Sequence, residues 1–169
     1  ANLVAIMKKI LSLFLCFISS LSASVNSYTV ENIAFPDDMP PEVGGLAIDE
    51  NGYLYACLRR GDVVITKPGK DLKATKWEVF ATGLHNPMGI ILIKSGHVIV
   101  SQMAELTEII DTDQDGKADR YNNLSTDFGI SGNYHETNAI CPDGNGGYYI
   151  ALGTASHNGP TFHTPRGEY

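Results

Sequence analysis

The chain has 169 residues, 18% of them charged, and a formal net charge of −7 at pH 7. Nucleic acids and anionic membrane surfaces attract basic patches, so this acidic balance argues against both as partners. Small neutral molecules and cations are the expected partners of such a chain.

The first predicted element is a secretory signal peptide over residues 7–23. Met7 is followed by two lysines, an apolar run over residues 10–18 and small residues up to Ala23, where cleavage is expected. The apolar run is shorter than the roughly 20 residues that a membrane helix needs. Residues 1–6 precede this start and are interpreted as an upstream artefact. We therefore expect an exported chain, periplasmic or extracellular, with no membrane span after cleavage.

Residues 24–169 are predicted to be all-β. Short runs of β-branched and aromatic residues alternate with Gly, Pro, Asn and Asp, and no stretch of ten residues keeps a helical period. Three stretches share one plan, with small residues at the start, a short strand, a turn containing Gly and a second strand. They are "GGLAIDENGYLYACL", "MGIILIKSGHVIVSQ" and "TNAICPDGNGGYYIALG".

The spacing of these three phrases predicts a β-propeller. Gly45 and Gly89 are 44 residues apart, and Asn138 follows Gly89 by 49 residues. A period of roughly 40 to 50 residues with about four short strands per unit is typical of propeller blades. A β-sandwich, the alternative fold, is not expected to repeat the same phrase at this spacing. Three blades do not close a ring, so we expect the N-terminal part of a six-bladed propeller. The expected blades span residues 43–87, 88–136 and 137–169.

Side chains of the predicted strand "GYLYACL" are expected to alternate between two apolar faces. One face should hold Leu54, Ala56 and Leu58, and the other Tyr53, Tyr55 and Cys57. Trp77, Val79 and Phe80 are expected in an outer strand of the first blade. His97 lies within a later strand and is expected to be exposed.

Cys57 and Cys141 are the two cysteines that follow the signal peptide. An exported chain folds in an oxidising compartment, where these thiols are able to form a disulfide. Two buried free thiols are the alternative, because spacing alone does not pair two cysteines.

The stretch "DTDQDGKADRYN" predicts a calcium-binding loop. Its acidic side chains recur at every second position, and Gly116 permits the sharp turn that lets them converge. A helix–loop–helix calcium hand would need a glutamate at the twelfth position, which is Asn122, and the flanking segments are predicted strands. A structural ion is favoured over a catalytic one, because a single hairpin takes all the carboxylates. A solvated hairpin without an ion is the alternative. The expected calcium ligands are Asp111, Asp113, Asp115 and Asp119.

Two predicted connections between blades carry the candidate catalytic and binding residues. "GLHNPMG" contains His85 and Asn86, and "GISGNYHETNA" contains His135 and Glu136. Propeller activity concentrates in loops at one end of the central channel. A histidine next to a carboxylate is a suitable general base, since its pKa lies near neutrality and the neighbour orients it. His135 with Glu136 is thus the predicted catalytic pair, and His85, Asn86 and His157 are candidates for binding a cofactor. The alternative for each histidine is a loop residue that bonds only to the backbone.

The stretches "VFATGLHNPMGI", "ELTEIIDTDQDGKADRY", "FGISGNYHE" and "NAICPDGNGGYYIALG" together resemble the quinoprotein glucose/sorbosone dehydrogenase-like propellers. The likeness covers about residues 33–169 and is strongest to the exported, membrane-bound dehydrogenase-like branch. It implies a six-bladed propeller that binds pyrroloquinoline quinone beside calcium and oxidises a sugar or an alcohol. In such propellers a histidine removes the hydroxyl proton as hydride passes to the quinone, and His135 lies near that place, with slightly shorter spacing to the next strand. Members of this branch often carry a C-terminal cytochrome c domain, which implies an electron acceptor beyond residue 169.

Two other functions remain open from the sequence. A non-catalytic propeller that binds carbohydrate or protein, with a structural calcium loop, would bind its ligand without reducing a quinone. A calcium-dependent lactonase would need carboxylates that converge on the channel axis, whereas the acidic residues found here share one hairpin. Motifs for serine hydrolases, haem attachment and nucleotide hydrolysis do not occur in the sequence.

Overall fold

The structure, a computed structural model, describes residues 28–103, 105–128 and 137–153. The chain divides into two units, residues 1–31 and 32–169, and all the strands belong to the second unit. Within the described residues the second unit contains ten strands, one short 3-10 helix and no α-helix, which confirms the predicted all-β class. No helix of the described part is long and apolar enough to cross a membrane.

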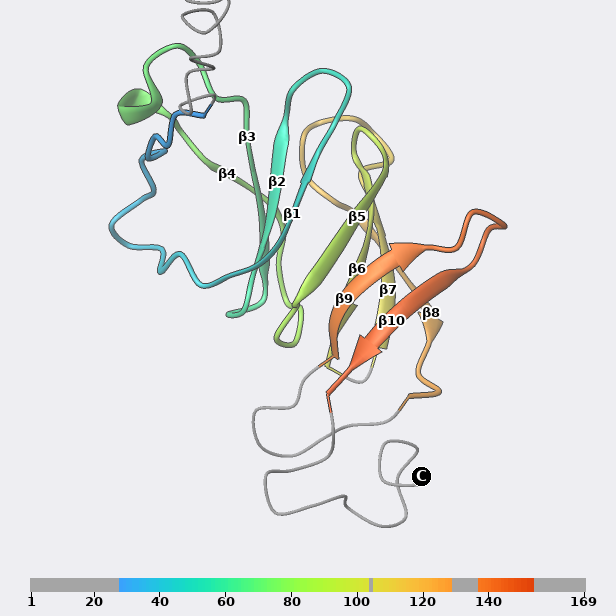
Figure 1. Cartoon of the computed structure of the whole chain (residues 1–169). Coiled ribbons are helices and arrows are strands. Elements are labelled where there is room, and N and C mark those ends of the chain that lie inside the picture. The colour runs from blue at the N-terminus through green and yellow to red at the C-terminus, as the bar shows by residue number, and fades with distance from the viewer. Residues whose placement is uncertain (1–27, 104, 129–136, 154–169) are drawn as a thin grey trace, which may run out of the picture. The chain divides into compact units, whose positions relative to one another are not determined.

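The first sheet contains four antiparallel strands that follow one another in chain order (Figure 1). The 3-10 helix η1 (Leu72–Ala74) lies in the connection between the third and fourth strands. The strands are β1 (Val43–Ile48), β2 (Leu54–Leu58), β3 (Asp62–Thr66) and β4 (Glu78–Ala81).

The second sheet repeats this order, and a two-stranded antiparallel sheet follows it. Each of the three phrases found in the sequence is the first hairpin of one sheet, namely β1–β2, β5–β6 and β9–β10. The strands of the second sheet are β5 (Gly89–Lys94), β6 (His97–Gln102), β7 (Glu105–Ile110) and β8 (Arg120–Ser125). Those of the third are β9 (Thr137–Pro142) and β10 (Tyr148–Leu152).

The turns of the first and third hairpins are built in the same way. Asp49 Oδ1 accepts the backbone N–H groups of Asn51 and Tyr53, at 2.9 and 2.8 Å. Asp143 Oδ1 likewise accepts two backbone N–H groups, those of the residues two and four positions later, at 2.7 and 2.8 Å. An aspartate that bonds its own backbone two residues on is a common turn former. The repeat seen in the sequence is therefore also a repeat of local structure.

Glycines allow the first strand of the first sheet to lie against the second sheet. A Cβ atom added at Gly44 would clash with the carbonyl oxygen of Pro87 and lie 2.8 Å from the Cα atom of Met88. One added at Gly45 would lie 3.1 Å from the backbone nitrogen of Ile90. The small residues that open the first phrase are thus required by backbone contact between β1 and the start of β5. In the same manner β9 lies next to β5 (Figure 1).

The main hydrophobic core lies between the first and second sheets. Tyr55 and Phe80 contribute its largest rings, which meet edge to face with centroids 5.5 Å apart. Ala56, Leu58 and Val64 form a second cluster on the opposite face of the first sheet. The predicted alternation is confirmed for Tyr55 and Cys57 against Ala56 and Leu58. The buried members of the main core are Tyr55, Cys57, Val63, Ile65, Phe80, Ala81, Leu84, Ile90, Val98, Val100 and Ile109.

The segment that precedes β1 covers part of the second cluster. Phe35 and Met39 pack against it together with Trp77. The Trp77 indole N–H donates to the carbonyl oxygen of Ala34 at 2.9 Å, and its ring centroid lies 4.9 Å from that of Phe35. Trp77 immediately precedes β4, so this contact joins the N-terminal segment to the outer strand of the first sheet.

The two described cysteines are both free, Cys57 buried and Cys141 exposed. The disulfide that the sequence left open is therefore not formed, and the alternative of two buried thiols holds for Cys57 only. Burial in the main core raises the pKa of the Cys57 thiol to about 12, because desolvation disfavours the thiolate.

Native protein treated with iodoacetamide at pH 8 should be modified at Cys141 and not at Cys57, because the thiolate is the reactive form. Unfolding in guanidinium should make both residues react. Peptide mapping by mass spectrometry identifies the modified cysteine. Equal labelling of both cysteines in the native protein would contradict the burial of Cys57.

Replacing Gly44 with Ala should destabilise the protein by about 1 to 3 kcal/mol, because the added methyl group overpacks the contact between β1 and Pro87. Urea unfolding of the whole chain measures this loss. Gly69→Ala is the matched control, since a Cβ atom there would meet nothing within 4 Å. Equal stability of the two variants would show that β1 does not approach the second sheet as described.

Candidate functional site

The connections between strands alternate between two ends of the sheets, because consecutive strands are antiparallel. We call the end that carries the β1–β2, β5–β6 and β7–β8 turns the acidic end. The opposite end, which carries the β2–β3 and β4–β5 connections, is the histidine end. Hydrogen bonds join the two sheets at both ends. Gly96 N–H donates to the Tyr55 hydroxyl at the acidic end, and Leu84 N–H donates to the Gly61 carbonyl at the histidine end, each at 3.0 Å.

Three of the four predicted calcium ligands come together in the β7–β8 turn at the acidic end. The carboxylates of Asp111, Asp113 and Asp115 offer oxygen atoms that lie within 4.8 Å of one another. Carboxylates held this close repel one another, and a hard divalent cation that takes oxygen ligands would relieve the repulsion. Three carboxylates supply part of the six to eight oxygens that calcium takes, so carbonyl groups or water would complete the shell.

Asp111 shapes the loop as well as contributing to this group. Its Oδ1 atom accepts the Gln114 N–H at 2.7 Å, and its Oδ2 atom accepts the Gly116 N–H at 2.9 Å. Gln114 and Gly116 both have left-handed backbone, with φ values of 63° and 90°. These two bonds hold the turn that brings Asp113 and Asp115 toward Asp111. Asp113 and Asp115 are exposed, and each accepts one nearby backbone N–H through Oδ1.

Asp119, the fourth predicted ligand, bonds to Thr112 across the base of the same hairpin. Its carboxylate accepts the backbone N–H of Thr112 at 2.9 Å and also the Thr112 hydroxyl. These hydrogen bonds favour the ionised form and lower the pKa of Asp119. The geometry gives Asp119 the task of closing the hairpin and leaves three carboxylates in the group.

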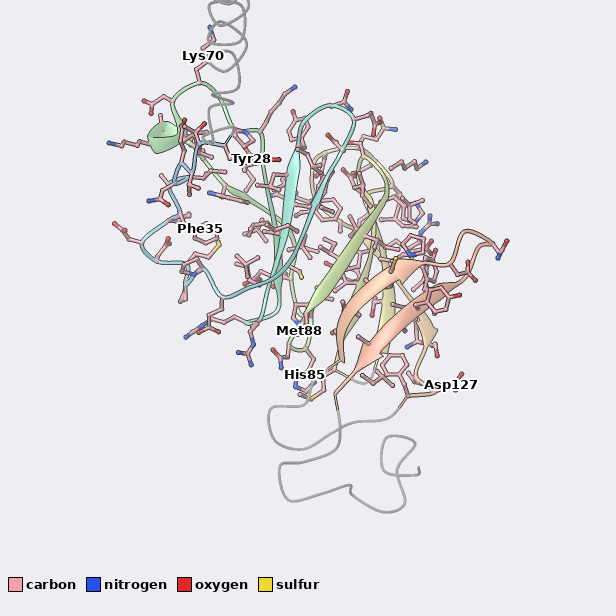
Figure 2. The ribbon with its side chains drawn as sticks, in the orientation of Figure 1. Tyr28, Phe35, Lys70, His85, Met88 and Asp127 are labelled. Carbon is pink, nitrogen blue, oxygen red and sulfur yellow. The ribbon has the colours of Figure 1, made fainter. Side chains whose placement is uncertain are left out.

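His85 and Asn86 lie together at the histidine end, in the connection from β4 to β5 (Figure 2). The backbone of His85 is fixed on both sides, because its N–H donates to the side-chain oxygen of Gln102 and its carbonyl accepts the Met103 N–H. Asn86 has left-handed backbone, with φ of 51°, and its Oδ1 atom accepts from Arg59 Nε at 3.2 Å. The His85 side chain is exposed. A rigid backbone thus presents an accessible imidazole beside an amide and a guanidinium group.

Three predicted site residues, His135, Glu136 and His157, lie outside the described residues. His135 and Glu136 belong to the connection that leaves β8 after Ser125 and enters β9 at Thr137. Because β8 ends at the histidine end, this connection starts at the same end as His85. Asp127, two residues after β8, lies toward that end in Figure 2.

Gln102 supports the histidine end, and we did not predict it from the sequence. It is a buried polar residue at the end of β6, and its amide N–H donates to Thr107 Oγ1 at 2.7 Å. The Thr107 hydroxyl in turn donates to Glu105 at 2.5 Å. The available signal was a glutamine at the end of an otherwise apolar strand, since a buried amide needs partners.

His97 is partly buried, which corrects the expectation that it is exposed. Its side chain is 15% exposed, and Nε2 lies 2.8 Å from Glu108 Oε1 on the neighbouring strand. The other Glu108 oxygen accepts from the Asn122 amide at 2.8 Å. These bonds, that from Asn122 first and then that from His97, lower the pKa of Glu108.

Asp113→Asn should weaken calcium binding on the order of tenfold, because it removes one of three converging negative charges. Calorimetric titration of the whole chain with CaCl2 measures the affinity. The variant should unfold at the wild-type temperature in EDTA, since asparagine keeps the oxygen that accepts the Asp115 N–H. Asp127→Asn, an exposed aspartate at the opposite end, is the control. Equal affinities for both variants would remove the acidic loop as the binding site.

Glu108→Gln should flatten the loss of stability on acidification. The pKa of Glu108 is lower in the folded state, so its stabilisation is complete above the unfolded pKa, about 4.3, and disappears as pH falls through the folded value. The contribution is less than about 1 kcal/mol, as for other solvent-screened pairs. Urea unfolding at a series of pH values between 7 and 3 measures it, with Glu50→Gln as the exposed control. Parallel pH profiles for wild type and Glu108→Gln would refute it.

Comparison with known families places most of the chain. A family model described as "Domain of unknown function (DUF7133)" matches residues 30–167. A search of curated proteins gave no significant match. The matched segment contains all ten strands, the acidic loop and both histidine-bearing connections, and it begins after the predicted signal peptide. Because the match spans well over half of the sequence, the chain belongs to the DUF7133 family.

Proposed function

We propose that the chain contributes the first blades of an exported propeller that oxidises a sugar or an alcohol with pyrroloquinoline quinone. One observation carries the proposal: two four-stranded sheets with the same strand order are followed by a third hairpin, and the first strands of all three are neighbours. Propeller blades are built and arranged in this way. A six-bladed ring with further blades from elsewhere in the protein completes the proposed fold.

The proposed catalytic end is the histidine end. In a propeller the first strands of the blades line the central channel, so the connections that lead into them surround the channel mouth. The connections into β5 and β9 carry His85 and His135. His135 would accept the proton of the substrate hydroxyl, and Glu136 would orient its imidazole and stabilise the charge that forms there.

The residues described at this end suit an anionic cofactor. Arg59 and Arg60 form the β2–β3 turn, and Arg59 already contacts Asn86 beside His85. Guanidinium groups bind carboxylates with good geometry, and pyrroloquinoline quinone carries carboxylates. Arg59 and Asn86 would thus hold the quinone, with His85 and His157 as further candidates. The bound quinone supplies the acceptor for the hydride that leaves the hydroxyl-bearing carbon.

We assign calcium, as proposed for the acidic loop, a structural task. The three carboxylates lie in the β7–β8 turn, at the end opposite to His85. An ion held there would stiffen the second sheet without contacting a substrate at the histidine end. The same placement gives no support to a lactonase, which would need carboxylates beside the channel axis.

The test is dye-linked oxidation of a panel of sugars and alcohols by the longest natural chain that contains these residues, with quinone and calcium added. His135→Ala should lower kcat by about 100-fold or more, which is the usual size of a general-base contribution. His163→Ala is the histidine control and should keep the parent rate. Turnover by His135→Ala at the parent rate would refute the base assignment. A folded, calcium-loaded protein without quinone-dependent turnover would instead favour a propeller that only binds carbohydrate or protein.

A further inference from the structure

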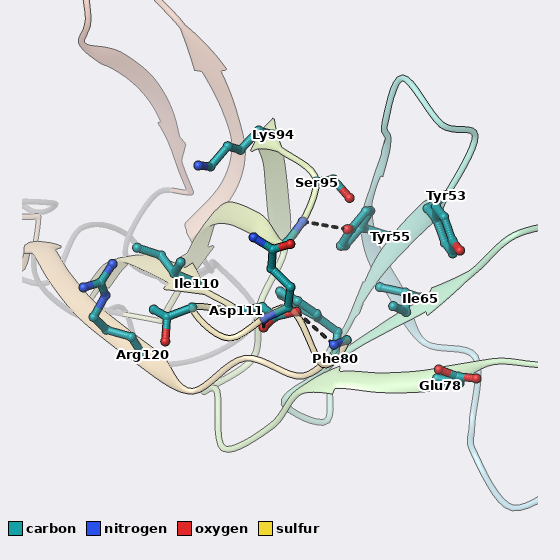
Figure 3. A pocket seen from close by; sticks show the side chains of 14 residues that line it. Tyr53, Tyr55, Ile65, Glu78, Phe80, Lys94, Ser95, Ile110, Asp111 and Arg120 are labelled. Carbon is teal, nitrogen blue, oxygen red and sulfur yellow. Dashed lines mark hydrogen bonds between the residues drawn. The ribbon is translucent and has the colours of Figure 1, made fainter.

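A cavity of about 630 Å³ opens between the first and second sheets at the acidic end (Figure 3). Strands β2, β3 and β4 form one wall, and the β5–β6 and β7–β8 turns form the other. Its size falls within the roughly 300 to 1,000 Å³ of small-molecule sites. It lies at the opposite end of the sheets from His85, and the proposed oxidation does not use it.

The floor of the cavity combines apolar rings with one hydroxyl group. Tyr55, Ile65 and Phe80 belong to the main core and are buried. Tyr55 is only 3% exposed, and its hydroxyl oxygen accepts the Gly96 N–H at 3.0 Å. Among the described residues this hydroxyl donates to no acceptor. A buried hydroxyl with an unused proton beside a cavity is suited to donate to a bound ligand.

The charges around the rim balance. Lys94 and Arg120 are the cations, and Glu78 and Asp111 are the anions. An ionic ligand of either sign would meet like charges on one side. The Asp111 carboxylate already accepts two backbone N–H groups, which reduces its capacity to bind a cationic ligand. The cavity therefore suits a ligand without net charge.

We propose that this cavity binds a neutral saccharide. The C–H face of a sugar ring would pack on the aromatic floor, and its hydroxyl groups would bond to the Tyr55 hydroxyl and to the polar rim. Tyr53 and Gln114 line the exposed part of the cavity and supply a second ring and an amide. A wholly apolar ligand would leave these polar groups without partners, and a polyphosphate would need an excess of cations.

The test is protein-observed NMR of the whole chain titrated separately with glucose, maltose and cellobiose. Binding should shift the Gly96 amide signal, because that N–H bonds directly to the Tyr55 hydroxyl. Tyr55→Phe removes only the hydroxyl oxygen and its proton and should weaken binding about tenfold. Tyr121→Phe is the matched control: the Tyr121 hydroxyl also accepts one backbone N–H, that of Thr82, but lies outside the cavity lining. This control should bind like the wild type.

A second variant keeps the test decisive if Tyr55→Phe does not fold. Tyr53→Ser changes a partly exposed ring at the rim and should weaken binding by about two- to tenfold. Absence of shifts at Gly96 with all three sugars, or equal affinity for the wild type and the folded cavity variants, would overturn the proposal. Because the readout is binding at the acidic end, it is independent of quinone turnover. Failure of one proposal leaves the other standing.

Discussion

The close approach of β1 to the start of β5 is the constraint on which the rest of the structure depends. Gly44 and Gly45 place the backbone of β1 against Pro87 and Ile90 without intervening side chains. At the histidine end Gly61 has φ of 113°, and a Cβ atom there would clash with the Leu84 carbonyl. These contacts set the distance between the first two sheets, so the core rings of Tyr55 and Phe80 interlock and the cavity above them stays open.

The antiparallel order of the strands separates two kinds of chemistry. Turns within the β1–β2, β5–β6 and β7–β8 hairpins gather carboxylates and tyrosines at one end, whereas the connections between sheets bring His85, Asn86 and Arg59 to the other. A cation in the acidic loop would therefore act on stability and on the wall of the saccharide cavity, since Asp111 belongs to both. The histidine end depends instead on the buried Gln102, which fixes the backbone of His85.

Local patterns were sufficient for the elements of the fold because they are set by neighbouring residues. Glycine-centred turns and β-branched runs predicted the first hairpin of each sheet, and alternation predicted which side of β2 holds Tyr55 and Cys57. The grouping of Asp111, Asp113 and Asp115 was also predictable, since all three lie in one tight turn. Asp119 joins Thr112 instead, because the register of β7 with β8 places those two residues opposite each other across the hairpin base.

The sequence by itself determined the all-β class, the repeat of hairpins and the position of the acidic loop, because each depends on residues close together in the chain. Tertiary structure alone decided what depends on packing between distant segments. Burial in the core leaves Cys57 a free thiol far from reaction, and a cross-strand carboxylate holds His97 partly buried. The saccharide cavity likewise arises from three strands and two turns that no sequence period connects. Periodicity reports which face of a strand is apolar, whereas only the approach of the sheets decides what that face meets.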